Sequence, residues 1–99
     1  MHVEARRFEL RLAGARSLKE KRSRIRPILD GARERYRVAA AEVAYQNQWQ
    51  RAALGFAAVS ASTSHLAEVL DEVERFVWSH PDIEVTRTTR DFLEVDADG

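Results

Sequence analysis

The stretch FELRLAGARSLKEKR, residues 8–22, contains the change of pattern that decides the fold. Every second residue from Phe8 to Leu12 is apolar and the residues between them are charged, which predicts a strand with one buried face. Residues 13–16 break this alternation. Ser17 and Glu20 then form the pattern of a capping box, whose hydroxyl and carboxylate accept hydrogen bonds from the first amides of a helix. A strand followed directly by a helix is therefore the first unit of the fold.

The rest of the chain repeats this alternation of strand and helix patterns. Apolar residues recur at helical spacing from Leu18 to Tyr36 and again from Leu66 to Val77. Small and apolar residues at 38–45 and 51–60, separated by a short polar segment, predict a hairpin with a longer loop. β-branched residues predict a last strand over 83–95.

The resulting order, βαββαβ, predicts an α+β ferredoxin-like sandwich. In this fold the first and third strands lie at the centre of a four-stranded antiparallel sheet, and both helices cover one face of it. The 99 residues fit a single domain, 1–99, in which we expect residues 96–99 to form a frayed acidic tail. Pro27 lacks an amide hydrogen, so we also expect a kink in the first helix, helped by Gly31.

Composition excludes several classes of site. Hydrophobic residues make up 44% of the chain and charged residues 32%, which is typical of a soluble domain and not of a disordered one. The absence of cysteine excludes disulfides, thiolate nucleophiles and cysteine-ligated zinc or iron–sulfur sites. Charges at Glu4, Arg6 and Arg7 interrupt the apolar centre that a signal peptide needs, and no run is long enough to span a membrane. We therefore expect a cytoplasmic protein.

Charge is distributed unequally along a chain whose net charge is zero. Residues 1–37 contain twelve Lys and Arg against five Asp and Glu, whereas residues 38–99 contain four against eleven. Such asymmetry indicates contact with a polyanion, or else an internal pairing of the basic half with the acidic half.

The basic half is most concentrated around the start of the first helix. Residues 15–26 contain six cations and one acid, although each cation in the first turn costs roughly 0.3–1 kcal/mol against the positive end of the helix dipole. An anionic ligand, such as a phosphate or a nucleic-acid backbone, would offset this cost. The candidate contacts are Arg16, Lys19, Lys21, Arg22, Arg26 and Arg33. The alternative is that these side chains cover the core with their methylenes and hold their charges in water, with Glu74 as a cross-helix partner.

Trp49 is the second feature that needs an explanation, because it lies in a polar loop next to Arg51. An exposed indole stacks on unpaired bases, with a gain of ~1–3 kcal/mol per base, and Trp49 and Arg51 are therefore candidate loop contacts. The alternative, which we favour at this point, is that Trp49 folds back over the edge of the sheet.

The third strand invites comparison with RNA-recognition motifs, which share the βαββαβ order. Residues 55–59 match part of their signature, but Ala58 and Ala61 stand where stacking aromatic residues are required. We therefore do not expect a conventional RNA-reading sheet. The uncovered face is expected to hold an apolar patch that supports a homodimer or a complex with another protein.

Sites for catalysis are sparse. His2, His65 and His80 lack the spacing of metal ligands, and no phosphate-binding or nucleophile motif is present. An enzyme using Glu42 or His65 is the least favoured reading. We accordingly expect no catalytic residue, no cofactor and no metal.

The segments ARSLKEKR, AEV, WQRA and LG resemble the YlxP-like family of small bacterial proteins, over nearly the whole chain. The resemblance implies a ferredoxin-like fold. It also implies a connection with RNA or the ribosome, because the family's genes often lie beside those for translation initiation and ribosome maturation factors. In the family's loop motif, Tyr45 stands at the position of a His and Asn47 at that of an acid.

Together these patterns predict a non-enzymatic protein that contacts RNA or ribosomal phosphates through the basic flank of its first helix. The alternative is an interaction module, homodimeric or with another protein, that uses the open sheet face.

Overall fold

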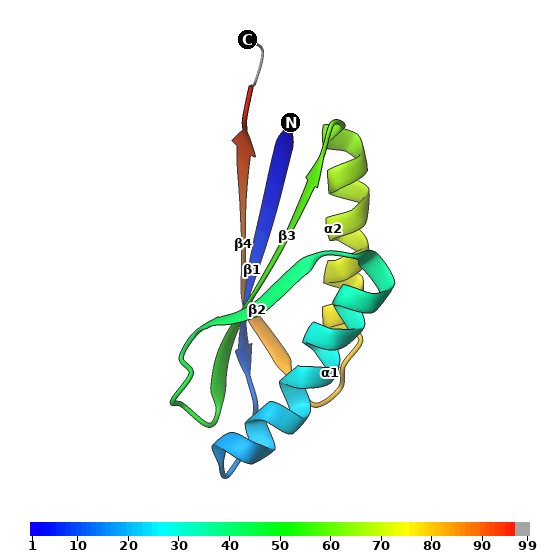
Figure 1. Cartoon of the computed structure of the whole chain (residues 1–99). Coiled ribbons are helices and arrows are strands. Elements are labelled where there is room, and N and C mark those ends of the chain that lie inside the picture. Colours follow the sequence, from blue (N-terminus) through cyan, green and yellow to red (C-terminus); the bar gives the residue numbers. More distant parts are fainter. Residues whose placement is uncertain (97–99) are drawn as a thin grey trace.

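The computed structural model describes residues 1–96 and has the predicted element order (Figure 1). The elements are β1 (His2–Arg11), α1 (Leu18–Tyr36), β2 (Ala39–Ala44), β3 (Arg51–Ser60), α2 (Thr63–Trp78) and β4 (Glu84–Glu94). They form one antiparallel sheet in the order β2-β3-β1-β4. The α+β ferredoxin-like prediction is confirmed, with β1 and β3 at the centre. Most of the tail predicted for 96–99 lies outside the described residues.

Local signals placed the element boundaries closely. β3 has the predicted bounds, while β2 and β4 are each one residue shorter at both ends. At the start of α1, the Ser17 hydroxyl accepts a hydrogen bond from the Glu20 amide at 3.0 Å, and the Glu20 carboxylate accepts one from the Arg16 amide at 3.0 Å. The capping box is confirmed, and it already satisfies two amides at this helix end.

The core lies between the sheet and the two helices. Alternate residues of the central strands, Phe8 and Leu10 in β1 and Leu54 and Phe56 in β3, point towards the helices and are buried. The helices close this layer with their apolar stripes. The buried apolar residues of the two helices are Ile25, Ile28, Ala32, Leu66, Leu70, Val73 and Val77.

Gly31 has a packing role that the sequence did not reveal. A Cβ atom on Gly31 would lie 2.5 Å from Cζ of Phe76, so the missing side chain lets α1 and α2 approach each other. Phe76 is held on other sides by Tyr36 and His80, whose rings contact it edge-on. α1 remains helical through Pro27 from Leu18 to Tyr36.

A buried charge cluster joins β1 to α2. Glu4 and Arg6 occupy the same face as Phe8, and the Arg6 guanidinium contacts Glu4 at 2.7 Å, Asp71 at 2.7 Å and Glu74 at 3.1 Å. Arg90 of β4 adds a second cation to Glu4 at 3.2 Å. The expected pairing of Glu74 with cations of the first helix is wrong, because Glu74 pairs with β1 instead.

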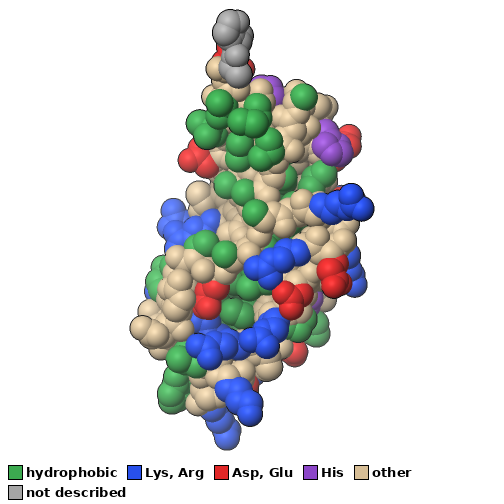
Figure 2. Space-filling model, in the orientation of Figure 1, with side chains coloured by type: hydrophobic (Ala, Val, Ile, Leu, Met, Phe, Trp, Pro, Cys, Tyr) green, Lys and Arg blue, Asp and Glu red, His purple; other side chains and the backbone are tan. Residues whose placement is uncertain are grey.

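The other face of the sheet is not covered by a helix. At one end of it, Val59 and Leu93 flank Val3 on the two neighbouring strands, and their side chains are 63% and 58% exposed. Hydrophobic side chains gather at the end of the molecule that holds the N-terminus, while Lys and Arg gather at the opposite end (Figure 2). Neither α1 nor α2 has the length and apolar character needed to cross a membrane, as judged over residues 1–96.

Candidate functional site

Three cations occupy the outer surface of α1. Lys19, Arg22 and Arg26 follow one another at spacings of three and four residues, which places them on one side of the helix, and all three are exposed. We call these three residues the basic flank. They border a shallow hollow of about 530 Å³ that Ser23, Pro27 and Asp30 complete. Within residues 1–96, no hydrogen bond or ion pair engages the side chains of the basic flank.

Lys21 does not belong to this surface. Its side chain is 1% exposed, and its ammonium group contacts the Glu42 carboxylate at 2.7 Å and the carbonyl oxygens of Tyr45 and Gln48 at 2.7 and 2.8 Å. The prediction that Lys21 contacts phosphate is wrong, because its ammonium group is buried, paired with Glu42 and hydrogen-bonded to two carbonyls of the same chain. The sequence contained a signal for this, since Lys21 precedes the buried Ile25 and Ile28 by four and seven residues and so shares their stripe.

The other cations near α1 differ in their pairing. Arg33 pairs with Asp30 at 2.9 Å and donates to the Ala40 carbonyl, so its charge is largely balanced internally. Arg24 is tied to Glu20 at 3.1 Å and to the Ala13 carbonyl at 2.9 Å. Arg16 precedes the helix and is exposed, and within the described chain its side chain has no partner. Of the six predicted contacts, four therefore keep a guanidinium or ammonium group available: Arg16, Lys19, Arg22 and Arg26.

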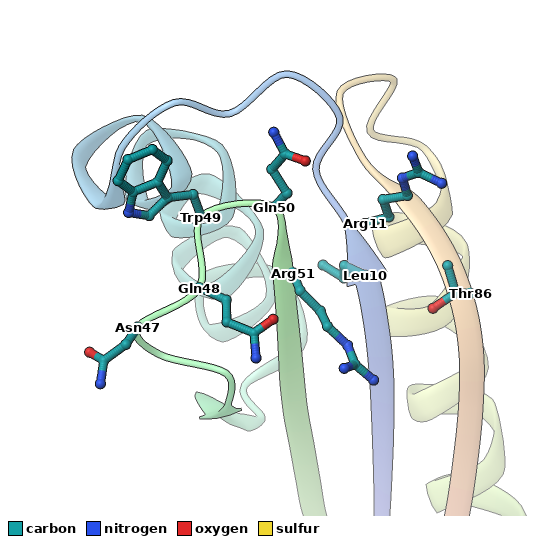
Figure 3. A pocket seen from close by; sticks show the side chains of 8 residues that line it. All are labelled: Leu10, Arg11, Asn47, Gln48, Trp49, Gln50, Arg51 and Thr86. Carbon is teal, nitrogen blue, oxygen red and sulfur yellow. The ribbon is translucent and has the colours of Figure 1, made fainter.

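The loop between β2 and β3 is tied to the start of α1. Besides the bonds from Lys21, the Gln50 carbonyl accepts from the Leu12 amide at 2.9 Å, and the Gln50 side-chain amide donates to the Ala15 carbonyl at 3.2 Å. Trp49 nevertheless points away from the core and is 52% exposed (Figure 3). The favoured expectation that Trp49 packs over the sheet edge is therefore wrong.

Trp49 stands at the rim of a second hollow, of about 600 Å³, at this end of the sheet (Figure 3). The lining residues are Leu10, Arg11, Asn47, Gln48, Trp49, Gln50, Arg51 and Thr86. Their side chains offer mainly amides, a hydroxyl and two guanidinium groups. The hollow is therefore rich in hydrogen-bond donors and acceptors.

Arg51 is held in place within this hollow. Its guanidinium lies 3.8 Å from the centre of the Tyr45 ring and 3.2 Å from the Glu9 carboxylate. Glu9 also accepts a hydrogen bond from the Tyr45 hydroxyl at 2.8 Å. This bond, followed by the charge of Arg51, lowers the pKa of the Glu9 carboxyl below its ordinary value. Arg11 lies opposite Arg51 in the adjacent strand and is exposed.

Comparison with known proteins identifies the family. Residues 3–90 match the family described as "Protein of unknown function (DUF503)". The chain belongs to this family. It is also 42% identical over 76 residues to "Uncharacterized protein YlxP" of Bacillus subtilis (strain 168), a match that covers 75% of this chain and 83% of that protein. The resemblance to the YlxP-like family is confirmed.

Tyr45 joins the loop of this DUF503 member to two neighbouring elements. Its backbone is left-handed, with φ of 63°, which turns its carbonyl towards Lys21 while its hydroxyl reaches Glu9. Tyr45 thus links α1, β1 and the loop.

The residues considered for catalysis are separate or already engaged. Glu42 is occupied by Lys21, and His65 is exposed at the start of α2. The His80 ring lies against Phe76, and its Nδ1 is 2.8 Å from the Phe76 carbonyl. Over residues 1–96, no group of three or more potential metal ligands comes together.

Proposed function

We propose that this protein is a non-enzymatic RNA-binding module whose basic flank, together with Arg16, engages RNA phosphates. The observation that carries the proposal is the contrast along α1. Lys21, Arg24 and Arg33 have internal partners, whereas the basic flank has none in the described chain and borders a hollow. Lys19 lies in the first turn of α1, where an unpaired cation is destabilising unless something negative compensates it.

The dimensions of the basic flank favour a polymer over a small anion. Lys19 and Arg26 are seven residues apart, which corresponds to about 10 Å along a helix axis. One phosphate contacts only part of such a row, whereas a nucleic-acid backbone presents a series of phosphates along it. The implied link of the YlxP-like family with RNA or the ribosome supports the choice of RNA, and a ribosomal RNA is the partner we propose.

A salt titration of a labelled, structured ribosomal RNA fragment tests the proposal. Four phosphate contacts, three from the basic flank and one from Arg16, give a plot of log K against log salt with a slope of about −3 to −4, because each contact releases somewhat less than one counterion. The triple variant Lys19→Gln/Arg22→Gln/Arg26→Gln should lose most of this binding and of its salt dependence.

The matched control removes the same charge from elsewhere on the surface. Arg7, Arg37 and Arg87 are exposed and lie outside the basic flank, so Arg7→Gln/Arg37→Gln/Arg87→Gln should bind RNA nearly as the unmodified protein does. Absence of binding at low salt, or an equal loss in the two triple variants, would refute the proposal.

A second candidate function is self-association through the open sheet face. The row of the exposed Val59 and Leu93 on either side of the half-buried Val3 favours it, because exposed apolar patches mark interaction sites. Sedimentation over a concentration series should then show a dimer that Val59→Ser/Leu93→Ser abolishes. A monomer at every concentration would exclude this second function.

A further inference from the structure

We infer that the hollow beside Trp49 binds an unpaired RNA base, with the Trp49 indole as the stacking surface. This inference rests on the proposed function, because it names the part of the RNA that the neighbouring loop would recognise. It starts from three observations: the exposure of Trp49, the anchoring of its loop, and the chemistry of the hollow.

The loop holds an aromatic ring in water on an ordered support. Residues on both sides of Trp49 are fixed, since the Gln48 carbonyl accepts from Lys21 and the Gln50 carbonyl accepts from the Leu12 amide. A large aromatic side chain normally contributes to stability by burial, and Trp49 leaves half of its surface exposed instead. A ring on a fixed backbone needs less ordering on binding than a ring on a mobile loop, which favours its use as a stacking platform.

The polar side chains of the hollow suit the edges of a base. Asn47 and Gln48 each carry a donor and an acceptor on one amide. Gln50 donates to the Ala15 carbonyl and the Thr86 hydroxyl donates to the Glu9 carbonyl, so these two side chains offer mainly their oxygens as acceptors. Such groups pair with the edges of bases that are not already paired. Arg11, whose side chain has no hydrogen bond or ion pair within residues 1–96, supplies a positive charge at the same place. The volume of about 600 Å³ is within the range of pockets that hold small molecules.

The loop of Trp49 lies at the first turn of α1, where the basic flank begins. The buried Lys21 donates to the Tyr45 and Gln48 carbonyls, and Lys19, the first residue of the basic flank, belongs to the same turn on another side of the helix. A strand whose phosphates follow the basic flank towards the start of α1 therefore runs towards the end of the helix that holds this loop. A base in a duplex is stacked on both sides within its own helix, so only an unpaired base can place a face on the indole.

A comparison of two polyanions distinguishes base stacking on Trp49 from phosphate binding by the basic flank. A single-stranded RNA oligomer offers phosphates and bases, whereas inorganic polyphosphate offers only phosphates. We expect Trp49→Ala to weaken binding of the oligomer about tenfold and to leave polyphosphate binding unchanged, while Trp49→Phe retains most of the affinity for the oligomer. The triple Gln variant of the basic flank should weaken both.

Fluorescence gives a second, direct measurement. In a Trp78→Phe background Trp49 is the remaining tryptophan, and its emission should be quenched by the oligomer and not by polyphosphate. Circular dichroism of Trp49→Ala serves as the folding control. If Trp49→Ala binds both polyanions as the unmodified protein does, base stacking on Trp49 is refuted, while phosphate binding by the basic flank remains supported. If the unmodified protein binds neither polyanion, the proposed function fails, and the inference with it.

Discussion

Replacing Lys21 by Met should destabilise the protein more than any surface change on α1. Lys21 is buried, and it neutralises the Glu42 carboxylate, whose own side chain is only 18% exposed. Removing one partner of a buried ion pair costs about 3–5 kcal/mol, because the other charge is left without compensation. The carbonyls of Tyr45 and Gln48 also lose a donor, so the loop at Trp49 is loosened at the same time.

The size of this effect makes it easy to measure. For a domain of about this length, 1 kcal/mol shifts the melting temperature by about 4–8 °C, so a loss of 3 kcal/mol corresponds to about 12–24 °C. Urea unfolding followed by circular dichroism gives the free energy directly. Lys19→Met is the matched control, because it removes the same charge from an exposed position two residues away. It should leave the free energy of unfolding unchanged or raise it by at most about 1 kcal/mol, since it relieves the cost of a cation in the first helical turn.

A second variant distinguishes a lost ion pair from a disturbed helix. Glu42→Met combined with Lys21→Met removes both charges, and apolar replacement of a buried pair is often close to neutral. The double variant should therefore be more stable than Lys21→Met alone. Equal stabilities of Lys21→Met and Lys19→Met, or a double variant that is no better than Lys21→Met, would show that the reasoning is wrong.

Two further predictions concern residues outside the basic flank. The hydrogen bond from Tyr45 and the charge of Arg51 lower the pKa of Glu9 from its ordinary 4.5. The ionised carboxylate therefore stabilises the fold above pH 4.5. This stabilisation is lost as the pH falls through the lower pKa of the folded state. In Glu9→Gln the free energy of unfolding should therefore decrease less than in the unmodified protein as the pH is lowered from 4.5. An equal decrease in the two proteins would contradict this. Gly31→Ala should cost about 1 kcal/mol despite the better helix propensity of Ala, because overpacking against Phe76 costs about 1–3 kcal/mol. Phe76→Leu should restore part of that loss, and a Gly31→Ala variant more stable than the unmodified protein would disprove the close contact.

The candidate site was only partly predictable. The concentration of cations on α1 is visible in the sequence, and the spacing of Lys19, Arg22 and Arg26 places them on one side of a helix. The sequence does not show which of these cations remain available to bind a ligand. Lys21 is neutralised by residues of β2 and the following loop, and these approach it only when the sheet has formed.

Trp49 was misjudged for a related reason. An indole in a polar segment more often folds onto the protein, and nothing local contradicts that expectation. Its exposure follows from bonds that join the loop to Leu12, Ala15 and Lys21, all more than twenty residues away in the chain. No pattern confined to the loop contains this information.

By itself, the sequence determined the order of the elements, the capped start of α1 and the faces that become core. These depend on neighbours within a few residues, through hydrogen bonds at helix ends and the periods of helices and strands. Only the tertiary structure decided which charges are paired, as with Arg6 in the cluster under α2, and which side chains face water. Pairing and exposure depend on the approach of distant segments, and a residue's own position in the chain does not specify its neighbours in space.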